Sequence, residues 1–73
     1  MEKKEIGAKI RKLRQDFGMT KRYLAKELGI GYSTLCAYEY GTRCPSDEVK
    51  IRIAKLFGQP VSRIFYAHEN NEM

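Results

Sequence analysis

The sequence predicts a compact all-α domain built from five short helices. Apolar residues recur at helical spacing in five segments, Gly and Pro mark the turns between them, and no segment alternates strongly with the period of two that indicates a strand. A chain of 73 residues is sufficient for a single domain, which we assign to residues 1–73 with a core of about 5–66. We expect the polar residues 67–73 to form a frayed tail.

The first two helices are expected at about 5–17 and 21–28. In the first, four apolar residues at spacings of 4, 3 and 4 form one stripe: Ile6, Ile10, Leu13 and Phe17. Thr20 is a suitable N-cap for the second helix, because its hydroxyl can accept a hydrogen bond from a free backbone N–H. The inner face of the second helix is formed by Leu24, Ala25 and Leu28.

The third helix is expected at about 32–40, the fourth directly after Ser46, and a short fifth helix at about 61–66. Ser46 caps the fourth helix, and Asp47 and Glu48 suit the positive end of its dipole. Pro60 is placed to start the fifth. The residues of these three helices that should face the core are Leu35, Tyr38, Val49, Ile53, Ala54, Phe57, Val61, Ile64 and Phe65.

Residues 21–41 have the features of a helix-turn-helix motif. Ala25 is small enough for two steeply crossing helices to approach each other, and Gly29 tolerates the positive φ that the turn requires. Ile30, Leu35 and Tyr38 supply the apolar contacts that fix the second helix of the motif against the first. In such motifs, the second helix enters the major groove of DNA.

Two charged residues lie close to apolar faces. Arg14 lies within the stripe of the first helix, and Glu39 follows Leu35 by four residues on the third. A lone charge on such a face is costly, so we expect the two to pair and clamp the first helix to the third. The alternative is that each lies at the edge of its stripe and reaches water.

These motifs resemble the phage repressor and Cro class of helix-turn-helix domains, the XRE family. The resemblance covers about residues 6–65 and rests on IRKLRQDFGMT, the turn LAKELGI, the pattern STL..YE.G, R.PS before the fourth helix, and IAKLFG. It implies a five-helix lambda-repressor-like fold, a dimer on a near-palindromic operator, and control of transcription, with repression as the expected mode. The pair Arg14–Glu39 falls where members of this class often have an Arg–Glu salt bridge.

The resemblance also assigns residues to DNA contacts. The implied base-facing residues are Gly31, Tyr32, Ser33, Cys36 and Ala37, and the implied phosphate contacts are Lys21, Tyr40, Thr42 and Arg43. Tyr32 could instead pack or contact phosphate, and Cys36 could be filler. Arg11 and Arg22 either add charge to this surface or are ordinary solvated residues.

The chain departs from the family pattern at three places. Gly31 replaces the usual Ser or Thr cap of the third helix, which weakens that cap by only a few tenths of a kcal/mol. Asp47 and Lys50 replace common apolar residues of the fourth helix, and Pro60 replaces the usual cap of the fifth. Because of the last two departures, the resemblance does not define which residues form the dimer surface.

The charge distribution suits a polyanionic partner such as double-stranded DNA. Residues 1–45 have 10 Lys/Arg and 5 Asp/Glu, a net charge of +5, whereas residues 46–73 have 4 of each and a net charge of 0. The whole excess therefore lies in the half that contains the helix-turn-helix.

Other classes of function find little support in the sequence. Cys36, Cys44 and His68 are not spaced like zinc ligands, so we expect reduced thiols and no metal or cofactor. The sequence shows neither paired carboxylates nor a nucleophile–base set, so nothing in it indicates an enzyme. Without a signal peptide or an apolar run of about 18 residues, the protein is expected in the cytoplasm.

Two alternatives concern partners. The apolar residues of the last segment either form a homodimer surface or pack into the domain's own core: Leu56, Val61, Ile64, Phe65 and Tyr66. The second alternative is a protein-interaction module, antitoxin-like or an adaptor, because Gly31, Cys36 and Ala37 offer few hydrogen bonds to bases.

Overall fold

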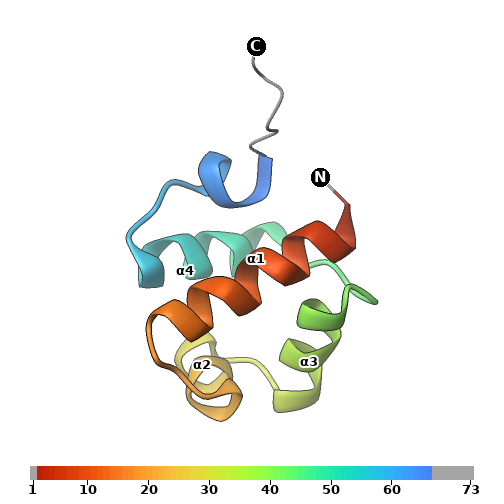
Figure 1. The fold of residues 1–73 in the computed structure, drawn as a ribbon, viewed down its shortest axis with the longest axis vertical. Helices are drawn as coiled ribbons and strands as arrows, with labels where there is room; N and C mark the ends of the chain where they lie inside the picture. Colours follow the sequence, from red (N-terminus) through yellow and green to blue (C-terminus); the bar gives the residue numbers. More distant parts are fainter. Residues whose placement is uncertain (1, 67–73) are drawn as a thin grey trace.

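The computed structural model describes residues 2–66, which form five helices and no strand in that range (Figure 1). These helices are α1 (Lys3–Asp16), α2 (Lys21–Leu28), α3 (Tyr32–Tyr40), α4 (Asp47–Phe57) and a one-turn π-helix, η1 (Ser62–Tyr66). The all-α fold is therefore confirmed. The frayed tail expected at 67–73 lies outside the described residues.

The core lies around α1, which crosses the centre of the molecule with η1 on one side and α2 and α3 on the other (Figure 1). Every helix contributes at least one side chain that is almost fully buried: Ile10, Leu24, Leu28, Leu35, Ile53, Ile64 and Phe65. The apolar periodicity of the sequence thus buries one face of each helix, and burial of these side chains is the main stabilising term.

The helix ends follow the local signals in the sequence. The Thr20 hydroxyl accepts a hydrogen bond from the Tyr23 N–H at 3.0 Å, and the Ser46 hydroxyl accepts one from the Val49 N–H at 3.3 Å. Gly29 ends α2 with φ at 70°, the left-handed conformation that favours glycine. Gly31 precedes α3 without a side-chain cap.

The first helix differs from its expected bounds. It begins at Lys3, where the Glu2 N–H donates to Glu5 Oε1 at 2.9 Å, and it ends at Asp16. Phe17 is therefore outside the helix and 51% exposed, with its ring edge-on to Phe57 at a centroid distance of 4.9 Å. The prediction that Phe17 continues the stripe of α1 is correct only in part, because the helix ends one residue too early to bury it.

The α4–η1 region contains a buried lysine that the apolar pattern did not predict. Lys50 donates a hydrogen bond from Nζ to the Tyr66 hydroxyl at 3.1 Å, and the same ammonium lies 5.6 Å from the Phe65 ring centroid. The hydrogen bond raises the pKa of Lys50 above its usual 10.5, whereas burial acts in the opposite direction. Two aromatic rings and a hydroxyl thus compensate a charge at a position where the resemblance implies an apolar residue.

Helix α1 packs closely against α3 at Gly7. A Cβ at this position would collide with the backbone carbonyl oxygens of Tyr38 and Glu39. Because those oxygens belong to the main chain of α3, they cannot move away as a flexible side chain would. Glycine is therefore needed here for close packing, a role that the sequence pattern assigned only to Ala25.

The apolar C-terminal residues differ in burial. Ile64 and Phe65 are buried in the domain's own core. Leu56 and Val61 are half-buried, and Tyr66 is exposed. Only these last three remain available to a partner.

Within residues 2–66, no helix combines the length and the apolar character that crossing a membrane requires.

Candidate nucleic-acid interface

The turn between α2 and α3 fixes the direction of α3. The Gly29 N–H donates to Lys26 O at 3.1 Å and the Ile30 N–H donates to Ala25 O at 3.0 Å, so the turn itself satisfies these two carbonyls. The last carbonyl of α2, Leu28 O, accepts from Arg52 Nη1 of α4 at 3.0 Å. Ala25, Leu35 and Tyr38 are buried, and Ile30 packs against the core at its edge. The five residues that predict the motif are thus brought together around this turn.

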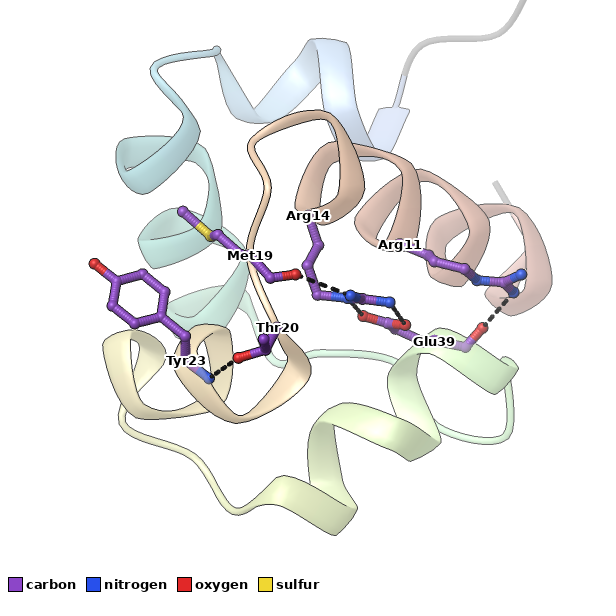
Figure 2. Close-up of polar contacts among 6 residues, drawn as sticks. All are labelled: Arg11, Arg14, Met19, Thr20, Tyr23 and Glu39. Carbon is purple, nitrogen blue, oxygen red and sulfur yellow. Dashed lines mark hydrogen bonds and ion pairs between the residues drawn. The ribbon is translucent and has the colours of Figure 1, made fainter.

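A buried ion pair joins α1 to α3 (Figure 2). Arg14 Nε lies 2.7 Å from Glu39 Oε2 and Arg14 Nη2 lies 3.2 Å from Glu39 Oε1, a bidentate arrangement. The side chains of Arg14 and Glu39 are only 11% and 4% exposed. The alternative in which each charge reaches water is therefore not what the structure shows.

The same arginine also orders the loop before α2. Arg14 Nη1 donates to the backbone oxygen of Met19 at 3.0 Å, directly before the Thr20 cap (Figure 2). Arg11 Nη2 makes a longer contact of 3.4 Å with the backbone oxygen of Glu39. Two arginines of α1 thus contact the C-terminal half of α3, so the position of α3 depends on α1 as well as on α2.

The outer side of α3 has no exposed negative charge. Glu39 is the only acidic residue between Tyr32 and Tyr40, and it is buried and paired with Arg14. The first residues that the resemblance assigns to base contacts, Gly31, Tyr32 and Ser33, are exposed. The exposed side of α3 can therefore approach a polyanion without repulsion from negative charges on this helix.

The other residues assigned to DNA contacts differ in accessibility. Cys36 and Ala37 are half-buried, so only part of each side chain is available. Tyr40 is 71% exposed, and Thr42 and Arg43 are exposed beside it in the loop after α3. The Thr42 hydroxyl donates to Ala37 O at 3.2 Å, which closes the end of α3 and leaves the hydroxyl oxygen free to accept.

Two contacts between α2 and α3 were not expected from the sequence. The ammonium of Lys21 lies 5.8 Å from the Tyr40 ring centroid, and the guanidinium of Arg22 lies 5.0 Å from the Tyr32 ring centroid. Both cations belong to the first turn of α2, and the two rings lie at opposite ends of α3. The sequence feature that could have predicted these contacts is the pair of adjacent cations on α2 together with the aromatic residues at both ends of α3.

The cysteines and acidic residues do not suggest another kind of site in the described part of the chain. Cys36 and Cys44 are free thiols, the first half-buried on α3 and the second exposed in the loop that follows. Across residues 2–66, no group of three potential metal ligands comes together.

Comparisons with known proteins agree with this geometry. The sequence pattern of the helix-turn-helix family matches residues 10–64. The chain is 34% identical over 66 residues to a cryptic phage CTXphi transcriptional repressor, RstR, of Vibrio cholerae; the match covers 90% of this chain and 60% of the repressor. It therefore spans less than two thirds of that relative.

Two archaeal proteins match over most of their length. An HTH-type transcriptional regulator of Methanocaldococcus jannaschii is 36% identical over 64 residues, which cover 88% of this chain and 96% of the relative. One from Archaeoglobus fulgidus is 33% identical over 57 residues, covering 78% and 81% respectively. Together with the clamped helix pair, these matches show that the chain belongs to the XRE-type helix-turn-helix family of DNA-binding transcription regulators.

Proposed function

We propose that this protein is a sequence-specific transcriptional repressor that places α3 in the major groove of a near-palindromic operator. One observation carries the proposal: the accessible side of α3 has no free carboxylate and is flanked by the cations Lys21, Arg22 and Arg43. The repressor name of the Vibrio cholerae relative supports the regulatory mode. The buried Arg14–Glu39 pair supports a fixed presentation of the helix.

The proposed contacts divide into two classes. Tyr32 and Ser33 lie at the exposed start of α3 and reach base edges, with Gly31, Cys36 and Ala37 lining the same side. Lys21, Tyr40, Thr42 and Arg43 contact the phosphates that flank the groove. The second class supplies affinity and orientation, and the first class supplies sequence preference.

We further propose that the protein binds its operator as a two-fold dimer. A single reading helix of nine residues contacts few base pairs, whereas two copies related by a two-fold axis read two half-sites. Leu56, Val61 and Tyr66 keep accessible surface in the C-terminal region and are the residues we assign to the partner contact. Sedimentation of the free and DNA-bound protein measures this stoichiometry.

The proposal is tested by selecting bound sequences from random duplexes at several salt concentrations. We expect an inverted repeat, with an affinity that falls steeply as salt rises because phosphate contacts release counterions. Arg43→Ala should weaken binding to all sequences alike and reduce the salt slope by about one. Ser33→Ala should change base preference within each half-site.

A matched control is Arg63→Ala, which removes one exposed positive charge from η1, the helix that lies across α1 from α2 and α3. It should change affinity much less than Arg43→Ala. Binding that is insensitive to salt, or no enrichment of any sequence, would contradict the proposed function. Stoichiometric co-purification with another protein, without DNA binding, would favour the protein-interaction module instead.

A further inference from the structure

The base-facing side of α3 lacks a side chain that can read a base through two hydrogen bonds. Gly31 and Ala37 offer no side-chain hydrogen bond, and Ser33 and Cys36 offer one short polar group each. Bidentate contacts are the ones that discriminate well between base pairs, and Arg, Asn and Gln make them. None of these three residue types occurs between Gly31 and Gly41.

Arg22 brings such a group to this side from the neighbouring helix. Its guanidinium carbon lies 5.0 Å from the centroid of the Tyr32 ring, and Tyr32 is the first residue of α3. Tyr32 is 45% exposed and Arg22 is exposed, so the pair is accessible from outside. Within residues 2–66, the guanidinium forms no ion pair with a carboxylate.

The contact with Tyr32 holds the arginine without using its hydrogen-bonding capacity. A cation–π contact depends on the positive charge over the ring, whereas the five N–H donors of the guanidinium remain available. The ring also restricts a long side chain, which lowers the entropy lost when the arginine binds. A positioned guanidinium with free donors matches the two acceptors, O6 and N7, that guanine presents in the major groove.

We propose that Arg22 is a specificity-determining residue of this protein, held by Tyr32 so that its guanidinium donates to O6 and N7 of one guanine in each half-site. This assignment rests on the proposed function. It makes Arg22 and Tyr32 one reading unit built from two helices.

Lys21 differs from Arg22 although it also lies over an aromatic ring. Its partner Tyr40 is at the other end of α3, beside Thr42 and Arg43 in the loop assigned to the phosphates. The ammonium is a point charge and lacks the planar fork that matches two acceptors. Lys21 therefore remains a phosphate contact, and the guanine contact is assigned to Arg22 and not to Lys21.

The experiment compares selected sequences and affinities for the wild type, Arg22→Ala, Arg22→Lys and Tyr32→Phe, with Arg63→Ala as the control for lost charge. The wild type should enrich a guanine at one position of each half-site. Arg22→Ala and Arg22→Lys should lose that preference and bind the selected operator about 5- to 150-fold more weakly per half-site. Tyr32→Phe keeps the ring and should keep the guanine.

The affinity of Arg22→Ala for operators with the guanine replaced separates base reading from a phosphate contact. If Arg22 reads the base, the variant and the wild type should bind the replaced operator with nearly equal affinity, differing by no more than the loss that Arg63→Ala shows in the same assay. An equal loss on both operators would overturn the assignment and make Arg22 a phosphate contact. A wild-type motif that Arg22→Ala leaves unchanged would overturn it as well, with the proposed function intact.

Failure of the proposed function has a separate signature. A wild-type protein that enriches no sequence contradicts DNA recognition itself, and the assignment of Arg22 with it. Circular dichroism of each variant verifies the fold, since Arg22 is exposed and its replacement should leave the helices unchanged. A variant of unchanged helicity and thermal transition that still shows the predicted loss of guanine supports the assignment.

Discussion

Glu39 receives both of its side-chain hydrogen bonds from Arg14, and neither residue has much access to water. Removal of one partner would leave the other charge buried without compensation. Such losses cost more than the pair itself contributes, because the isolated charge cannot regain its hydration.

We therefore expect Arg14→Ala to lower the free energy of unfolding by about 3–5 kcal/mol. Urea denaturation measures this difference. The double variant Arg14→Met/Glu39→Leu removes both charges while keeping similar volume, and it should be more stable than either single alanine variant. A single variant as stable as the wild type would show that the pair is hydrated in solution.

Lys50 gives a prediction about titration. Its pKa should lie above 10.5 in the wild type, because the hydrogen bond to Tyr66 favours the charged form. In Tyr66→Phe this largest cause is absent, so the pKa of Lys50 should be lower than in the wild type. Following the Cε resonance of Lys50 against pH by NMR measures both values.

The sign of the stability effect follows from the raised pKa. A group with a pKa that is higher in the folded state stabilises the protein fully below its unfolded value, here 10.5, and this contribution is lost as pH rises through the folded value. The contribution of Lys50 should therefore be constant near neutral pH. Equal Lys50 titration midpoints in wild type and Tyr66→Phe would contradict the role of the hydroxyl.

At the scale of the helix, the ends of α2 and α4 depend on single hydroxyls. Thr20 and Ser46 each accept a hydrogen bond from an N–H of the first turn. Thr20→Ala and Ser46→Ala should each lower the free energy of unfolding by about 1 kcal/mol. Chemical denaturation measures the cost, and Thr20→Asn serves as a control that keeps a capping group. An alanine variant with unchanged stability would show that water replaces the cap.

Packing of α1 on α3 gives a larger effect at Gly7. Gly7→Ala gains about 1 kcal/mol of helix propensity, but the new methyl would collide with the carbonyl oxygens of Tyr38 and Glu39. Because overpacking against the backbone costs about 1–3 kcal/mol, we expect a net loss of stability. Thermal unfolding measures it.

Gly31→Ala is the matched control for Gly7→Ala. A Cβ at Gly31 has only the Thr34 hydroxyl within 4 Å, at an ordinary contact distance of 3.7 Å. This substitution should change stability by less than about 1 kcal/mol. If Gly7→Ala is as stable as Gly31→Ala, α1 and α3 are not packed as closely as the structure indicates.

At the scale of the whole molecule, the core is small, so binding of an operator to the folded state should add substantially to its stability. A domain of this size buries only about 60% of the surface of its unfolded chain. Binding of the selected operator to the folded state alone should therefore raise the melting temperature, by an amount corresponding to about 2.7 kcal/mol when free DNA is at 100 times Kd. Differential scanning calorimetry with a scrambled duplex as control measures this, and equal shifts for both duplexes would contradict sequence-specific binding.

The sequence predicts those parts of the molecule that depend on neighbouring residues. The caps at Thr20 and Ser46 and the turn at Gly29 are local, and each is present in the structure. The pairing of Arg14 with Glu39 could also be predicted, because each charge interrupts an apolar stripe and so requires a partner.

What the sequence did not predict depends on how distant segments meet. Lys50 is stabilised by Tyr66, 16 residues away, and Gly7 is required by two carbonyl oxygens of α3. The contact between Arg22 and Tyr32 needs the crossing angle of two helices, which periodicity within either helix does not give. The DNA contacts of individual residues remain predictions, since they depend on a partner as well as on the fold.

The two sides of α3 carry separate tasks, and this bears on how such a domain could be re-targeted. Leu35, Tyr38 and Glu39 hold the helix in place from within, whereas Ser33 and Ala37 carry small side chains on the accessible side. Because Ser33 is exposed and belongs to neither the ion pair nor the core, a new side chain at this position should leave both intact. If α3 reads the operator as proposed, its outer side is open to redesign by selection for new operators, while Leu35, Tyr38 and Glu39 keep the helix in place.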